Sequence, residues 1–185
     1  MNIAYRTPLT VPEYLAWADA QSERPRTELI DGQIVQMASQ LAIHARLTGR
    51  AFTALSDALA ESGLAGEVFN AGMLVPISAT SAFEPDTLLY LGAPISDRQL
   101  TVPTPVVIVE VLSPTTAHID RGVKLTGYFT LPSVAHYLIL DPETMSVTRH
   151  TRAADGAVVA TTHTGGPLIL DPPGLTLDLD RIMKR

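Results

Sequence analysis

The hydrophobic positions in the first third of the chain predict two helices with a hairpin between them. The stretch TVPE (10–13) has the residue types of a helix start, and apolar side chains follow it. ELIDGQIVQM (28–37) holds two short apolar runs around Asp31-Gly32, a dipeptide that favours a two-residue hairpin turn. From about 41 to 61 the apolar residues recur at helical spacing, so we expect a second helix, which Gly63 would end.

The middle of the chain changes to an extended pattern. EVFNAGMLVPI (67–77), DTLLYL (86–91) and VVIVEVL (106–112) are rich in strand-forming residues and are separated by Gly, Pro or Ser. A short helix is predicted from about 119 to 130, because Leu131-Pro132 would end it.

The last third of the chain is predicted to be almost entirely β. AHYLILD (135–141) has the apolar run of a buried strand. The tail, from about 145 to 185, is predicted to be an antiparallel appendage that completes the sheet or builds a dimer contact. Its strand-like segments are SVTRHT (146–151), AVVATTHT (157–164) and PLILD (167–171).

Together these elements predict a mixed α/β fold in one domain over residues 1–185, with a core of about 26–150. A length of 185 residues fits one such domain. The order of elements is hairpin, helix, three strands, helix, strand and β tail.

Composition narrows the class of protein. With 46% hydrophobic and 17% charged residues, the chain is typical of a globular protein, and no apolar run is long enough to cross a membrane. The absence of cysteine excludes disulfides and thiolate metal sites, and we expect a cytoplasmic location. The net charge of −6 disfavours binding to nucleic acid through bulk charge, although a homodimer could present a local basic groove.

Glu110 is the most unusual polar residue of the sequence. It lies inside VVIVEVL, where strand alternation places it on one face with Ile108 and Leu112 and leaves the other face to valines. Both faces are therefore apolar, as in a central strand covered on both sides. An unpaired carboxylate there costs several kcal/mol, so a metal ion, a cation or a set of donors must compensate it.

Asp86 is the second candidate acid. If its strand pairs with that of Glu110, the two carboxylates converge at one end of the sheet, where their repulsion is strong. A divalent cation would relieve this repulsion, and Mg²⁺ uses one or two carboxylates together with water and phosphate oxygens. Each acid could equally be a structural group that is bonded to backbone N–H groups or to an arginine.

Lys124 lies on the helix predicted after the strand of Glu110. Asp120 and Tyr128 share its helix face at a spacing of four residues. A helix packed on that strand could bring the ammonium group to the carboxylates, where it could orient a water nucleophile or offset charge in a phosphoryl transition state. The alternative is a lysine on a solvated helix face.

The motifs resemble one known family. TELIDGQIV, His44, EPDTLLY, VVIVEVLSPTT, DRGVKLTGYF and VAHYLILDPETMSV occur in the order seen in the bacterial Uma-type restriction endonuclease family, a domain of the PD-(D/E)XK nuclease superfamily. The resemblance covers about residues 10–149. It implies a restriction-endonuclease-like core, a central mixed sheet flanked by helices with acids at its end, an N-terminal hairpin and a C-terminal β extension.

The resemblance also implies roles for individual residues. Asp86 corresponds to the "PD" aspartate and Glu110 to the acid of "(D/E)XK", so these two would hold the metal. Glu28 corresponds to an additional acid from the N-terminal region. Leu112 stands where the standard motif has lysine, and Lys124 is the matching residue in this family.

At two further positions the comparison with the family leaves an alternative open or shows a departure from its pattern. His44 falls where the family often has a histidine, and it is either part of the site or a partly exposed helix residue. Gln33 stands where the hairpin usually has a second glutamate, so a supporting carboxylate would be missing.

These features lead to a primary hypothesis and two rivals. The primary hypothesis is a Mg²⁺- or Mn²⁺-dependent endonuclease that hydrolyses DNA and works as a homodimer, with catalytic residues Asp86, Glu110, Lys124 and Glu28 and accessory residues His44 and Tyr128. One rival is a non-catalytic, partner-binding module that retains the nuclease fold; another is a hydrolase of small phosphoesters. No function is predicted for His150 or His163, which we expect at the surface of strands.

Overall fold

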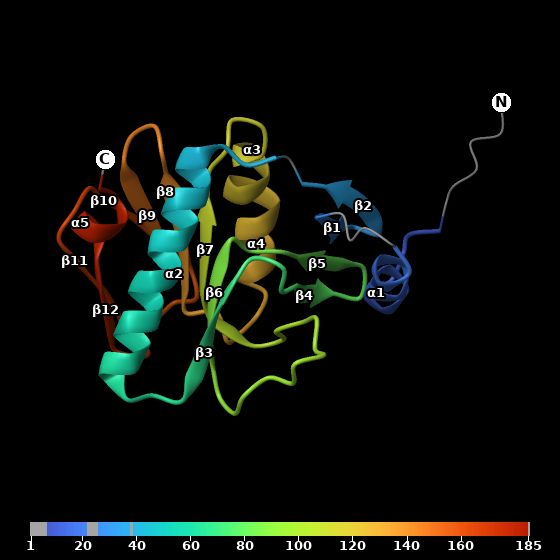
Figure 1. Cartoon of the computed structure of the whole chain (residues 1–185), viewed down its shortest axis with the longest axis horizontal. Coiled ribbons are helices and arrows are strands. Elements are labelled where there is room, and N and C mark those ends of the chain that lie inside the picture. The colour runs from blue at the N-terminus through green and yellow to red at the C-terminus, as the bar shows by residue number, and fades with distance from the viewer. Residues whose placement is uncertain (1–6, 22–25, 38, 185) are drawn as a thin grey trace.

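A computed structural model describes residues 7–21, 26–37 and 39–184 of the chain (Figure 1). Its helices are α1 (Val11–Asp19), α2 (Ala42–Ser62), α3 (Ala117–Ile119), α4 (Leu125–Tyr128) and α5 (Leu179–Ile182), and a π-helical segment, η1 (Asp120–Lys124), joins α3 to α4. Its strands are β1 (Thr27–Ile30), β2 (Gln33–Gln36), β3 (Gly66–Asn70), β4 (Val75–Ser78), β5 (Ser81–Phe83), β6 (Thr87–Leu91), β7 (Pro105–Val111), β8 (His136–Asp141), β9 (Ser146–Arg152), β10 (Val158–His163), β11 (Pro167–Leu170) and β12 (Leu175–Asp178).

The centre of the molecule is a six-stranded mixed sheet with the strand order β10-β9-β8-β7-β6-β3. Strands β7 and β8 run parallel, because the helical segment from α3 to α4 crosses over between them, and the other neighbours are antiparallel. Strand β7 is thus an interior strand with a partner on each side. Its predicted central position is confirmed.

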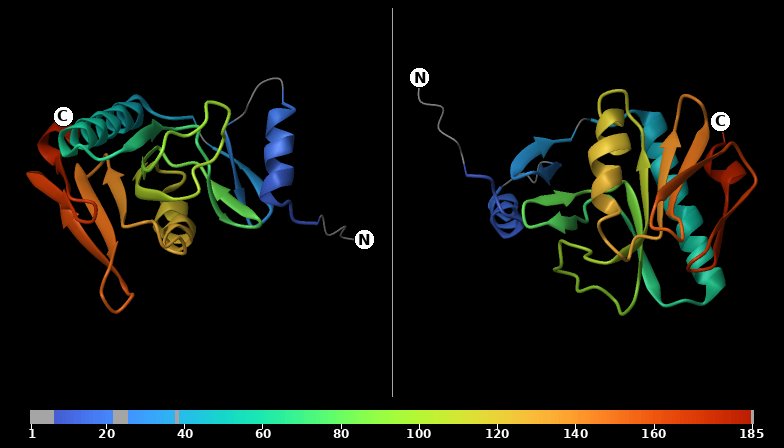
Figure 2. Two further views of the ribbon diagram at one scale, coloured as in Figure 1. Left: turned by 90° about the horizontal axis from the view of Figure 1, so that it is seen from below. Right: turned by 180° about the vertical axis from the view of Figure 1, so that it is seen from behind.

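Helices cover the two faces of this sheet (Figures 1 and 2). On one face, Val107, Val109 and Val111 of β7 share a core with α2 and with the C-terminal segments β11, β12 and α5. On the other face, Ile108 and Leu112 pack in a second core with Tyr128 of α4. The alternation predicted for β7 is therefore present, and Glu110 belongs to the face that α4 covers.

The N-terminal hairpin belongs to a separate, smaller sheet with the order β2-β1-β5-β4. Asp31 and Gly32 both have positive φ, 49° and 77°, which is the geometry of the tight turn that the Asp-Gly dipeptide predicts. Helix α1 starts as expected, since the Glu13 carboxylate accepts hydrogen bonds from the Thr10 backbone N–H at 2.8 Å and from its hydroxyl at 2.7 Å.

Several predicted boundaries were wrong. The segment 67–77 is not one strand, because Ala71 and Gly72 take positive φ of 28° and 88° and direct β3 and β4 into different sheets. The crossover helix begins at Ala117 and ends at Tyr128 rather than spanning 119–130. The short elements β5 and α5 were not predicted, since neither has enough residues to show a period.

The β tail divides into two parts. Strands β9 and β10 extend the central sheet, which confirms that the tail completes it, whereas β11 and β12 form their own hairpin against α2. The surface position expected for His150 was wrong, because this residue is half-buried and its ring centroid lies 5.8 Å from that of Tyr137.

The fold is therefore a mixed α/β structure with a central mixed sheet flanked by helices, as the sequence predicts. Within the described residues, no helix is both long and apolar enough to cross a membrane.

Candidate active site

Asp86 and Glu110 lie next to each other at one end of the central sheet. Strands β6 and β7 are antiparallel and pair Thr87 with Val109, so the next position along brings Asp86 beside Glu110. The backbone N–H of Val111 donates a 2.8 Å hydrogen bond to Asp86 Oδ2, which fixes this carboxylate against the end of β7. The pairing on which the two-acid prediction depended is present.

The side chain of Lys124 extends from the crossover helix to the end of β7. Its Nζ lies 2.9 Å from Glu110 Oε1 and 2.7 Å from Glu28 Oε1. Asp120, one turn earlier in η1, places Oδ1 at 3.7 Å from the same ammonium. The ammonium group is therefore enclosed by three carboxylates rather than exposed on a helix face.

Glu28 reaches the site from the smaller sheet. It lies on β1, and its Oε1 accepts a 2.8 Å hydrogen bond from the backbone N–H of Glu84, just before β6. Because Glu84 directly follows β5, this hydrogen bond lies within the smaller sheet, and the ion pair with Lys124 connects Glu28 to the crossover helix. An acid in a hairpin would ordinarily be solvated, and here it is buried.

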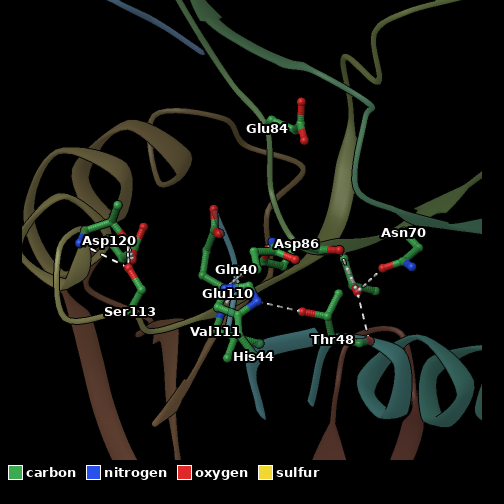
Figure 3. A network of polar contacts seen from close by, with 12 residues as sticks. Gln40, His44, Thr48, Asn70, Glu84, Asp86, Glu110, Val111, Ser113 and Asp120 are labelled. Atoms are coloured by element: carbon green, nitrogen blue, oxygen red, sulfur yellow. Dashed lines mark hydrogen bonds and ion pairs between the residues drawn. The ribbon is translucent and has the colours of Figure 1, made fainter. Parts of the chain in front are cut away.

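His44 and Gln40 approach Asp86 from the start of α2. His44 Nε2 lies 3.2 Å from Asp86 Oδ2, and Gln40 Nε2 donates to Oδ1 at 3.1 Å. The Thr48 hydroxyl lies 3.4 Å from His44 Nδ1, on the other side of the ring (Figure 3). His44 is thus a buried neighbour of Asp86 and not the partly exposed helix residue of the alternative interpretation.

Tyr128 contacts Glu110 from the side of the apolar core. Its hydroxyl donates a 3.0 Å hydrogen bond to Glu110 Oε1, the oxygen that also contacts Lys124. The Tyr128 ring packs against Phe83 with centroids 5.5 Å apart and against Tyr137 at 5.2 Å. These aromatic contacts hold the hydroxyl in place, and they make the environment of Glu110 apolar on that side.

These groups line a cavity of about 240 Å³ at the end of the sheet. Figure 3 shows the Glu110 side chain between those of Asp120 and Asp86, whereas Glu84 points away from them. The walls come from β2, the start of α2, the loop after β7 and the crossover helix. The exposed fractions of the charged side chains are very small: Glu110 2%, Asp86 3%, Asp120 3%, Lys124 3% and Glu28 4%.

Burial and mutual repulsion shift the pKa values of these groups. Burial raises the pKa of Glu110 well above its usual value, and Lys124 only partly opposes this. Burial also raises the pKa of Asp120, to about 6. For Lys124, burial favours the neutral amine, but the carboxylates of Glu110, Glu28 and Asp120 outweigh it and raise its pKa. The raised pKa favours the ammonium form of Lys124, which donates hydrogen bonds.

The donor set is compatible with a magnesium-like ion. Carboxylate oxygens are the ligands that Mg²⁺ prefers, and one or two of them suffice because water and phosphate oxygens complete the shell. Within the described residues, no group of three or more His, Asp or Glu side chains is arranged to hold a metal by itself. Asp86 and Glu110 thus fit a site that the substrate helps to complete, not a closed protein cage.

The structure brings all six residues of the sequence hypothesis together. Asp86, Glu110, Lys124, Glu28 and His44 line the cavity, and Tyr128 contacts it through Glu110. Sequence reasoning gave Asp120 only as a neighbour of Lys124 on the helix, although its acidic type at a buried position was a usable signal. Gln40 was missed altogether, because a polar residue before a helix carries no pattern.

A cluster of hydroxyl groups at the cavity rim was also missed. Ser113 Oγ lies 2.7 Å from Thr116 Oγ1 and 3.2 Å from Thr115 Oγ1, and Thr116 Oγ1 donates to Asp120 Oδ2 at 3.3 Å. All three hydroxyls belong to the segment SPTT (113–116), which follows β7 after Leu112. Such a segment is usual at the start of a helix, so its sequence alone did not distinguish capping from a contribution to the site.

A central mixed sheet flanked by helices, with acids at the ends of neighbouring strands, is the architecture of restriction-endonuclease-like proteins. Residues 11–181 match the Uma2 family, which is described as "Putative restriction endonuclease". The chain belongs to this family, and the resemblance drawn from its motifs is confirmed.

The chain is also similar to two curated proteins and to a solved structure. The chain is 30% identical over 158 residues to uncharacterized protein sll1609 of Synechocystis sp. (strain PCC 6803), covering 84% of this chain and 87% of that protein. Uncharacterized protein slr1290 of the same organism is 30% identical over 151 residues, covering 80% and 76%. A crystal structure described as "a putative nuclease belonging to DUF820", from Anabaena variabilis ATCC 29413, superposes with a TM-score of 0.74 at 14% identity and covers 95% of this chain and 98% of that one, which shows the shared fold.

Proposed function

We propose that the protein is a Mg²⁺- or Mn²⁺-dependent endonuclease that hydrolyses DNA phosphodiester bonds. The observation that supports this most is the meeting of Asp86, Glu110, Glu28 and Lys124 in one buried cavity, although they come from four separate segments of the chain. A single buried acid has many structural explanations. Three converging acids with one cation, in a member of this family, are better explained by chemistry on a phosphate group.

Asp86 and Glu110 would hold the divalent ion. When bound, such an ion polarises a phosphoryl oxygen and lowers the pKa of coordinated water. The contacts of Asp86 suit this role, because Val111 N–H, Gln40 and His44 orient its carboxylate without an adjacent permanent cation. Glu28 would keep the ammonium of Lys124 in the cavity, since it forms the shortest of the lysine's three ion pairs.

Lys124 would act as a fixed positive charge. Its raised pKa keeps the ammonium protonated, so it donates hydrogen bonds and does not remove a proton. A protonated lysine in a cavity shielded from water stabilises the negative charge that develops on phosphate oxygens in the transition state. It can also orient an attacking water as a donor. Tyr128 would hold Glu110 in place from the apolar side.

The test is a cleavage assay on supercoiled plasmid and on circular single-stranded DNA with Mg²⁺ or Mn²⁺. We expect cleavage by the wild type to stop when EDTA is added. The cleavage rate should be at least about 100-fold lower in Asp86→Asn and in Lys124→Met. Matched controls are Asp97→Asn and Lys184→Met, which change exposed residues outside the cavity. Cleavage at the wild-type rate in both site variants would reject the assignment.

One observation favours the rival hypothesis of a non-catalytic, partner-binding module. Lys124 already compensates Glu28 and Glu110, so the buried acids have a cation without any metal. Titration calorimetry with Mn²⁺ in the presence of DNA separates the two functions. Heat of binding that disappears in Asp86→Asn supports the nuclease, whereas no binding at millimolar Mn²⁺ supports the non-catalytic module.

A further inference from the structure

The reactive groups of this site are almost completely hidden from the surface. Each of the acids Glu28, Asp86, Glu110 and Asp120, together with Lys124, is at most 4% exposed. A phosphodiester can reach them only by entering the cavity, which has a volume of about 240 Å³. Pockets that enclose a drug-sized ligand are usually larger, about 300–1,000 Å³. The available space therefore fits about one nucleotide unit.

We propose that the substrate is an unpaired DNA strand and not an intact duplex. This inference rests on the proposed nuclease function and narrows it. The phosphates of a duplex lie on a stiff helix with a persistence length of about 50 nm, and its major groove alone is about 12 Å wide. One phosphate of such a stiff helix cannot enter a narrow cavity, because the neighbouring nucleotides would have to enter with it. A single strand bends freely, so one nucleotide can enter while the others remain outside.

The charged residues of the cavity wall also favour a single-stranded substrate. Among the described residues that line it, Lys124 is the one lysine or arginine, and it is buried against acids. A protein that grips duplex DNA neutralises several phosphates at once, because the duplex carries one negative charge per about 1.7 Å of its axis. The described residues that line the cavity offer no comparable set of cations. The cavity suits a substrate that presents few phosphates to the protein.

The rim instead offers neutral groups of the kind that contact a sugar or an unpaired base. Thr115 contributes a hydroxyl and Gln36 an amide, whereas Gln40 and Thr116 already donate to Asp86 and Asp120. Val35 from β2 and Ile119 from α3 add apolar surface to the cavity. Enzymes that carry out chemistry on a base within a narrow pocket work on single strands or take the nucleotide out of the duplex. Hydrogen-bonding edges are free only in an unpaired base.

The experiment compares three end-labelled DNA substrates of one sequence in the presence of Mn²⁺. They are a single strand, a full duplex, and a duplex with an unpaired bubble at its centre. We expect the wild-type protein to cut the single strand and the bubble at least 10-fold faster than the duplex, with bubble cuts confined to its unpaired positions. Equal or faster cutting of the full duplex overturns the inference and leaves the nuclease function intact. No metal-dependent cleavage of any substrate overturns the nuclease function, and the inference with it.

A variant at the rim tests whether the walls cause the selectivity. In the double variant Val35→Ala/Ile119→Ala, which replaces none of the charged residues, we expect the ratio of single-strand to duplex cleavage to fall at least threefold. Ile169→Ala, an exposed apolar residue on β11, is the matched control and should keep the wild-type ratio. A thermal melt confirms that each variant is folded before its ratio is measured. An unchanged ratio in a folded double variant overturns the role of the walls.

Discussion

The two halves of the candidate site are stabilised by different means. Around Glu110, the negative charge is balanced by the ammonium of Lys124, which also contacts Glu28 and Asp120. Around Asp86, the partners are a backbone N–H, the amide of Gln40 and the ring of His44. One half is an ion-pair network, whereas the other is a set of oriented hydrogen bonds.

This difference determines how much stability the protein loses when one contact in either half is removed. An ion-pair network that loses its cation leaves uncompensated charge in an apolar place, which is among the most costly changes in a protein. A hydrogen-bonded carboxylate that loses one of several donors keeps the others, so the cost is smaller. Variants in the two halves should therefore differ in stability as well as in activity.

The largest effect is expected for Lys124→Met. The substitution keeps most of the apolar side chain but removes the charge that Glu28, Glu110 and Asp120 share. We expect the free energy of unfolding to fall by about 3–5 kcal/mol, measured by urea denaturation at pH 7. Lys184→Met, at an exposed lysine, should change it by less than about 0.5 kcal/mol. A loss of less than about 1 kcal/mol in Lys124→Met would contradict the network described for this half.

Asp120→Asn should alter how stability depends on pH. The pKa of Asp120 is raised from 3.8 to about 6, so between these values the folded chain holds a proton that the unfolded chain has lost. The wild type therefore loses stability from this group as pH rises through about 6, by up to about 3 kcal/mol. As the pH rises from 4 to 8, the free energy of unfolding of Asp120→Asn should therefore increase relative to that of the wild type.

Urea denaturation across that pH range measures the difference between the Asp120→Asn and wild-type curves. Asp155→Asn, at an exposed turn, should follow the wild type at every pH. If the Asp120→Asn curve ran parallel to the wild-type curve, the buried environment assigned to this carboxylate would be wrong.

His44→Ala tests the hydrogen-bonded half. It removes one contact to Asp86 while Val111 N–H and Gln40 remain. We expect the free energy of unfolding to fall by about 2 kcal/mol, in the range of hydrogen bonds to charged groups, measured by urea denaturation. His163→Ala on the edge strand β10 is the control and should have little effect. A loss in His44→Ala as large as that in Lys124→Met would remove the distinction between the two halves.

The smallest effect is expected for Tyr128→Phe. The hydroxyl that it removes donates to Glu110 Oε1, but Lys124 still contacts the same oxygen. We expect a decrease of about 1.5 kcal/mol in the free energy of unfolding. Tyr90→Phe, outside the site, is the control. A gain in stability would show that the hydroxyl is not needed to satisfy Glu110.

Much of the fold could be predicted from local patterns. Asp31-Gly32 marked the hairpin, Gly63 marked the end of α2, and alternation assigned the two faces of β7 correctly, because each signal acts over a few residues. The break at Ala71-Gly72 was missed because Ala rarely adopts positive φ. The π-helical turn η1 was missed as well, since its sequence has the pattern of an ordinary helix.

The candidate site could be predicted only in part. The acids next to apolar runs were visible in the sequence, since a charge in such a place needs a partner. The identity of each partner was not visible, because Glu28 on β1 and Lys124 in η1 lie far apart in the chain and meet only in the folded structure. Their catalytic and metal-binding roles stay predictions, as does the single domain over residues 1–185.

The sequence by itself determined most of the element types, the family and the need to compensate Glu110, because periodicity, turn residues and the cost of a buried charge are local properties. Only the tertiary structure decided that Lys124 compensates Glu110 while His44 and Gln40 hold Asp86. The reason is that ion pairs and hydrogen bonds depend on distances of about 3 Å between side chains, and folding alone sets such distances for residues far apart in the chain.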